Sequence, residues 1–169
     1  TRRSSDLAKS LYGGRLTEEE YRFIAFASKI VCCGLGLLWI SGALFLLHYH
    51  QANPAGLENP KVWAKVSIVA ILTLNGVYIH KEVLPELKRN AGFPVFHRTP
   101  KLKRSMMLAS AAVSLVSWYT PLVLGVMSEL NFAASAQAIL MAYCLVLLLG
   151  ILGTHLLFGL LTAHESARL

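Results

Sequence analysis

The chain has 169 residues, of which 55% are hydrophobic and only 15% are charged, and its formal net charge is +7. Soluble proteins average about 25% charged residues, so this composition excludes an ordinary soluble domain and predicts an integral membrane protein. The basic residues lie beside apolar segments, which is typical of membrane topology and argues against a nucleic-acid partner.

The N-terminal flank, residues 1–29, is polar and basic and changes into a helix before the first apolar run. Thr17, followed by glutamates as far as Glu20, forms a capping box, which predicts that a helix begins there. We expect this helix to continue without a break into a first membrane span at about residues 30–48. Because the sequence does not begin with Met, we leave open a longer product with a further N-terminal helix.

A second span is predicted at about residues 62–84, after Asn59 and Pro60, which suit the N-cap and the first helical position. The connection after it, residues 85–105, is the most basic part of the chain. We assign the basic side chains near its end either to the orientation of the chain or to contact with lipid headgroups. These side chains are Lys101, Lys103 and Arg104.

The last two spans contain most of the polar residues that we expect inside the bundle. The third, at about residues 106–127, has serines at spacings of three and four, which allow helices to pack closely in lipid. The fourth, at about residues 134–163, has no charged residue and exceeds the roughly 20 apolar residues that cross a bilayer. Its polar residues share a narrow sector of a helical wheel, which we expect to pack against the serines and the Asn75 side of the second span. The expected packing seam consists of Ser110, Ser114, Ser117, Gln137, Cys144, His155 and Thr162.

Together these patterns predict an all-α integral membrane protein with a single membrane domain over residues 1–169. Its four transmembrane helices should form a bundle in which each helix is antiparallel to its neighbours in the sequence. Positive-inside weighting places residues 1–29, residues 85–105 and the C-terminus in the cytoplasm. The connections after the first and third spans have few positive charges, in agreement with this orientation.

The sequence contains no nucleotide-binding, protease or hydrolase motif, and no Asp or Glu lies within a predicted span. We therefore expect no catalytic residues and no enzyme. The three cysteines, Cys32, Cys33 and Cys144, lie in apolar runs and are odd in number, so they predict neither a disulfide framework nor a metal site.

His155 is the only histidine deep within a predicted span, and its role has two interpretations. A neutral imidazole bonded to a serine of a neighbouring helix would be a packing contact. Alternatively, His155 and His80 would be the axial ligands of one b-type haem, although their expected depths differ by about 6 Å at 1.5 Å per residue. The cofactor is therefore unknown, with haem b as the one candidate.

The run NPKVWAKVSIVAILTLNGVYIHKEVLPEL resembles a segment of small uncharacterised bacterial multi-pass membrane proteins. In those proteins a helix that ends in His is followed by a short NP-type loop and a WxK entry to the next helix. The resemblance covers mainly residues 39–87. It implies a bacterial inner membrane and no particular activity, and an additional N-terminal helix is common in such proteins.

From these observations we expect a non-enzymatic membrane protein, a small subunit or accessory protein of a larger inner-membrane assembly. Its partners would be membrane lipids and either other membrane-protein subunits or further copies of itself. Two alternatives stay open: a haem-binding electron-transfer subunit that uses His155, and a small permease or channel.

Overall fold

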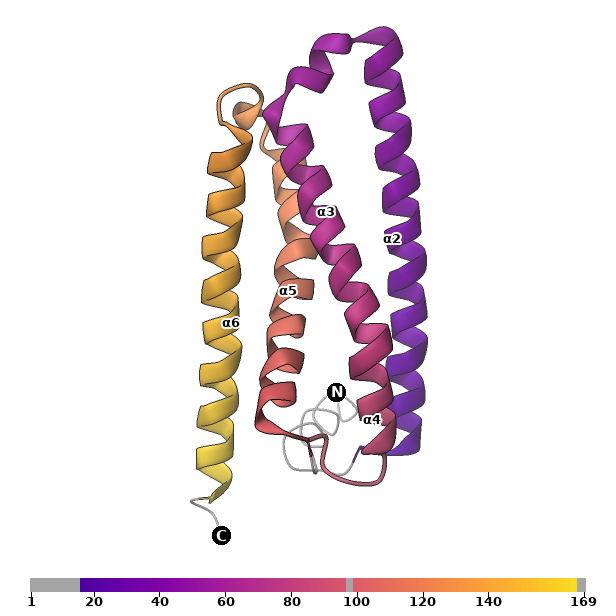
Figure 1. The fold of residues 1–169 in the computed structure, drawn as a ribbon, viewed down its shortest axis with the longest axis vertical. Coiled ribbons are helices and arrows are strands. Elements are labelled where there is room, and N and C mark those ends of the chain that lie inside the picture. Colours follow the sequence, from indigo (N-terminus) through magenta and orange to yellow (C-terminus); the bar gives the residue numbers. More distant parts are fainter. Residues whose placement is uncertain (1–15, 97–98, 167–169) are drawn as a thin grey trace.

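The computed structural model describes residues 16–96 and 99–166, with the side chains of the last helix as far as Leu160. Within this part of the chain, four helical segments are long and apolar enough to cross a membrane (Figure 1). The predicted all-α bundle of four membrane helices is therefore confirmed. The elements in chain order are α2 (Glu18–Ala52), η1 (Pro54–Glu58), α3 (Pro60–Tyr78), η2 (Ile79–Val83), α4 (Leu84–Arg89), α5 (Lys101–Val126), η3 (Ser128–Leu130) and α6 (Ala136–Ser166).

The helices extend beyond the predicted spans at the end of the bundle where α4 is joined to α5, which we call the basic end. α2 and α5 both begin before the apolar runs at residues 30–48 and 106–127. Hydropathy detects only the apolar part of a helix, whereas the helix itself continues through the polar residues of its first turns. The capping box is present at the start of α2, where Thr17 Oγ1 accepts from Glu20 N at 3.2 Å and Glu20 Oε2 accepts from Thr17 N at 2.8 Å.

The second span contains a π-helical turn near its basic end. α3, η2 and α4 form one continuous segment of 30 residues, Pro60–Arg89. In η2 the backbone N–H of Leu84 donates to the carbonyl of Ile79, five residues earlier. A π turn holds more residues than an α turn, so it changes which face the following residues present to their neighbours. His80 lies within this turn.

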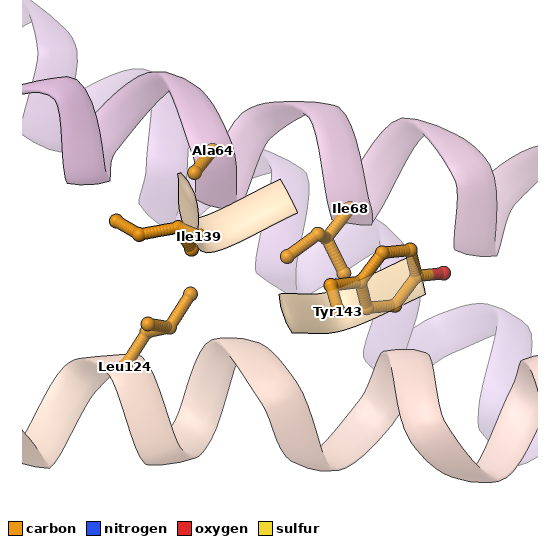
Figure 2. Close-up of a cluster of buried hydrophobic side chains, with 5 residues drawn as sticks. All are labelled: Ala64, Ile68, Leu124, Ile139 and Tyr143. Carbon is orange, nitrogen blue, oxygen red and sulfur yellow. The ribbon is translucent and has the colours of Figure 1, made fainter. Parts of the chain in front are cut away.

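α3, α5 and α6 pack together, and α2 lies at the edge of the bundle (Figure 1). The side chains of the main hydrophobic core converge between the three packed helices (Figure 2). Ala64 and Ile68 come from α3, Leu124 comes from α5, and Ile139 and Tyr143 come from α6. This core therefore belongs to the last three spans rather than to all four.

A second, smaller core closes the basic end of the bundle, where α2 begins and α6 ends (Figure 1). Leu16, which precedes the N-cap of α2, is bonded to the connection between α4 and α5. Leu16 N donates to Phe93 O at 2.9 Å, and Gly92 N donates to Leu16 O at 2.6 Å. Gly92 has a φ of +88°, a conformation that favours glycine. The connection is thus folded against the entry of α2. The buried side chains of this core are Leu16, Leu87, Val95 and Met107.

Candidate functional site

The side-chain amide of Asn75 joins α3 to two serines of α5. Asn75 Nδ2 donates to Ser114 Oγ at 2.9 Å and to the Ser110 carbonyl at 3.0 Å. Ser110 Oγ donates to Asn75 Oδ1 at 2.8 Å. An amide without partners is strongly unfavourable in an apolar environment, so these bonds make Asn75 compatible with the membrane interior. Ser110 and Ser114 of the expected seam therefore face α3.

The third serine of the expected seam faces α6 and contacts a residue that the sequence analysis did not identify. Ser117 Oγ and Tyr143 OH lie 2.8 Å apart, and both residues are buried. Hydropathy patterns treat tyrosine as apolar, so they give no signal for its hydroxyl. The serine was predicted only as part of a seam that packs against the fourth span.

Two members of the polar sector predicted on the fourth span, Gln137 and Cys144, do not lie on the packing face of α6. Gln137 and Cys144 are exposed, whereas Ile139 and Tyr143 are buried. The expected packing of Gln137 and Cys144 against the serines is therefore corrected. The face of α6 that packs against α3 and α5 carries the large side chains of Ile139 and Tyr143. This is expected because helices in lipid associate largely through van der Waals packing. Thr162 lies beyond the side chains that the structure describes.

His155 is half-buried and bonded at both ring nitrogens. Nδ1 lies 2.8 Å from the carbonyl oxygen of Ile151, one turn earlier in α6, and Nε2 lies 2.8 Å from Ser105 Oγ on α5. Because a carbonyl can only accept, Nδ1 carries a proton, and Nε2 shares a hydrogen bond with the serine hydroxyl. This geometry agrees with the packing interpretation, in which the imidazole is bonded to a serine of a neighbouring helix. Ser105 precedes the apolar run of the third span, so hydropathy did not include it.

His80 connects η2 to α2. Its Nε2 lies 2.9 Å from Cys32 Sγ and 3.2 Å from Ser28 Oγ, and the residue is exposed. A cavity of about 40 Å³ adjoins this group, with Gly76 and Trp118 in its wall. A space of this size holds only a few water molecules. The histidine is therefore a contact between helices beside a small cavity.

The two histidines proposed as haem ligands have separate partners. His80 bonds to α2 and His155 bonds to α5, while α2 and α6 lie on opposite edges of the bundle (Figure 1). Ligation of one haem iron by both would require each Nε2 to give up its present contacts. Among the described residues, no three His, Cys, Asp or Glu side chains are placed to hold a metal ion.

Two of the three basic residues assigned to lipid or topology contact the protein. Lys103 Nζ lies 3.0 Å from Glu86 Oε2 and 3.4 Å from Glu82 Oε2. The Arg104 guanidinium lies 4.8 Å from the centre of the Phe158 ring on α6. The ion pairs of Lys103 thus connect the start of α5 to η2 and α4. The cation–π contact of Arg104 connects it to α6. Lys101, the third of these residues, is exposed.

At the opposite end, a lysine on α3 caps the C-terminus of α5. Lys61 is only 4% exposed, and its Nζ donates to the Met127 carbonyl and to Asn131 Oδ1, the latter at 3.0 Å. Asn59 Nδ2 also donates to Asn131 Oδ1, at 3.3 Å. The ammonium group offsets the partial negative charge at the end of a helix. The sequence analysis did not identify this contact, because a lysine beside a helix start resembles an ordinary interfacial residue.

The fold and these contacts define the class of the chain: an all-α membrane protein whose polar side chains are bonded between its helices. No family model matches the sequence, and neither a curated protein nor a solved structure matches it. The resemblance of residues 39–87 to small bacterial membrane proteins stays a prediction. Function therefore has to be inferred from the described residues themselves.

Proposed function

We propose that the protein is a non-enzymatic subunit or accessory protein of a larger assembly in the bacterial inner membrane. The observation that carries this proposal is the poor packing of its first span. None of the 35 residues of α2 is buried, whereas α3 and α5 each contain five buried residues. A partner helix beside α2 would provide the packing that the described residues of the chain do not.

α2 is held to the rest of the bundle at a few points along its length. Near the basic end His80 bonds to it, and further along Trp39 Nε1 donates to Thr73 Oγ1 at 3.0 Å. Helices in lipid associate through close packing as well as hydrogen bonds, and α2 has little of the former. Its exposed surface includes a row of large apolar side chains: Phe26, Leu37, Ile40, Leu44 and Leu47.

In-membrane photo-crosslinking tests this proposal. A photoreactive residue at Ile40 or Leu44 of α2 should give one discrete protein adduct in native membranes, because a partner helix would lie against these positions. Leu148 and Leu152 on α6 are matched controls, since they are equally apolar and about equally exposed. The controls should crosslink mainly to lipid. Adducts to lipid alone from both helices would contradict the proposal.

The haem alternative has its own test. A b-type haem held by His155 with His80 would replace the bonds to Ser105 and Cys32, and it would give the purified protein a Soret band. We expect no such band, because each imidazole already has protein partners. A Soret band that disappears in His155→Ala but persists in the control His50→Ala would instead favour the electron-transfer subunit.

A further inference from the structure

One corner of the bundle presents basic side chains that the described residues leave exposed. It lies where η2 and α4 meet the start of α5. Lys103 and Arg104 at this corner already have partners in the protein. The remaining basic side chains are exposed, and we call this group the basic corner: Lys81, Lys88, Arg89 and Lys101.

The neighbouring carboxylates do not neutralise the basic corner. Glu82 and Glu86 both point toward Lys103, at 3.4 and 3.0 Å. Arg89 Nη1 lies 4.0 Å from Glu86 Oε2, but 79% of the arginine side chain is exposed. At this distance, and with the arginine so exposed, the pair contributes little. The basic corner therefore presents unbalanced positive charge to its surroundings.

Exposed apolar side chains lie beside these cations. Leu102, directly after Lys101, is 74% exposed, and Met106 and Phe93 are about half exposed. Cations next to exposed apolar side chains suit the boundary between lipid headgroups and acyl chains. A soluble acidic partner suits the corner less well, because Leu102 and Met106 belong to a helix that spans the membrane.

The length of the second span places the basic corner at the depth of the headgroups. Pro60–Arg89 has 30 residues, which is about 45 Å of helix, whereas the hydrocarbon core is about 30 Å thick. The excess of about 15 Å lies outside the hydrocarbon core. The last turns of this segment carry most of its charged residues, so we place them among the headgroups. Lys81, Lys88 and Arg89 all lie in these turns.

We propose that the basic corner binds the phosphate groups of anionic phospholipids in the leaflet that it faces. Ammonium and guanidinium groups donate charge-assisted hydrogen bonds to phosphate oxygens, and each basic side chain near an anionic surface strengthens binding about fivefold. On the other side of the same end, Glu18 and Glu19 are exposed on α2 and would repel such lipids. The exposed Arg22 and Lys29 of α2 are balanced by these two glutamates, so we expect binding on the α4–α5 side. The ligand is a lipid, so this inference does not depend on the proposed partner subunit.

The test uses the full chain, delipidated in a neutral detergent and titrated with phosphatidylglycerol or phosphatidylcholine. Native mass spectrometry counts the retained lipid, and the melting temperature is followed in parallel. We expect phosphatidylglycerol to bind more tightly, to raise the melting temperature more and to lose both effects at high salt. The double variant Arg89→Gln with Lys101→Gln should weaken phosphatidylglycerol binding at least about tenfold and leave phosphatidylcholine binding unchanged.

The double variant Arg22→Gln with Lys29→Gln is the matched control. It also removes one exposed arginine and one exposed lysine, but from α2. It should keep its affinity for phosphatidylglycerol. An equal loss in both variants would show an effect of net charge and overturn the proposal, as would unchanged binding in the basic-corner variant. If glycerol phosphate raised the melting temperature as much as the lipid does, the corner would be a site for a soluble phosphate, which would also overturn the proposal.

Discussion

The hydroxyl groups of Ser117 and Tyr143 are buried between α5 and α6, so each depends on the other for a hydrogen bond. Replacing Tyr143 with Phe leaves the serine hydroxyl without this partner. We expect a loss of about 1 kcal/mol in the free energy of unfolding, measured by titration with denaturing detergent in mixed micelles. Tyr119→Phe is the control, because Tyr119 is exposed on α5, and it should change the free energy little.

The pair can also be tested by a double-mutant cycle. Ser117→Ala should cost a similar amount, and the combination with Tyr143→Phe should cost less than the sum of the two single changes. The reason is that the second change removes a group that has already lost its partner. Strictly additive losses would mean that the two hydroxyls do not interact in the membrane.

The polar residues show what can be read from a sequence at the scale of single residues. The serines of the third span were predicted to lie on a packing face because of their small size and spacing, and the Asn75 side of the second span was expected opposite the fourth span. The identity of the hydrogen-bond partners could not be read, because Tyr143 and Ser105 carry no hydropathy signal of their own. The wheel of the fourth span grouped Gln137 with Cys144, but a wheel does not show which side of a helix is buried.

At the scale of elements, η1 is packed against the end of α2 through Gly56. A Cβ on Gly56 would lie 2.6 Å from Cδ1 of the Tyr49 ring, close to the attachment of the ring to the backbone. We expect Gly56→Ala to destabilise the protein by about 1–3 kcal/mol, because the ring or the turn must move. Thermal unfolding in detergent measures this change.

Gly36→Ala is the control for this substitution. A Cβ on Gly36 would meet nothing within 4 Å, and alanine favours a helix over glycine by about 1 kcal/mol. This change should therefore leave the melting temperature unchanged or raise it slightly. If Gly56→Ala behaved in the same way, η1 would not be packed against Tyr49 as described.

A second element-scale prediction concerns the attachment of α5 to α4. Lys103→Gln removes the cation that bridges Glu82 and Glu86, and Glu86 is a buried residue. We expect a lower melting temperature than for Lys101→Gln, which changes an exposed lysine two residues earlier. Equal melting temperatures for the two variants would show that the bridge does not stabilise the bundle.

The elements themselves were largely predictable. The long apolar runs predicted the four spans. The capping box predicted the start of α2, and Asn59 with Pro60 predicted the start of α3. The π-helical turn was not predictable, because IHKEV has no composition that separates it from a regular helix. Such a turn results from packing on both sides of the segment rather than from local preference.

For the whole molecule, the concentration of exposed lysine and arginine at one end predicts an orientation. We propose that this end, where α6 also ends, faces the cytoplasm. A fluorescent protein fused after Leu169 should therefore fold and fluoresce, and alkaline phosphatase fused there should be inactive. Phosphatase fused after Leu57, between the first two spans, should be active. The opposite pattern of activities would reverse the orientation.

The arrangement of the helices in the bundle could not be predicted from sequence. All four spans are apolar around most of their circumference, and lipid accepts any apolar face as readily as a neighbouring helix does. The composition of α2 therefore does not predict its peripheral position in the bundle. It becomes visible only through burial, because α3 and α5 bury residues that α2 does not.

The π-helical turn η2 lies between α3 and α4 in the second span. It changes the rotation of α4 about the helix axis relative to α3. If the same residues formed ordinary α-helix instead of a π turn, everything after them would be rotated by about 100° relative to α3. Glu82 and Glu86 would then no longer face Lys103, although the span would remain as apolar as before. The extra residue of the π turn thus allows α3 to pack against α5 and α6 while α4 packs against the folded connection between α4 and α5.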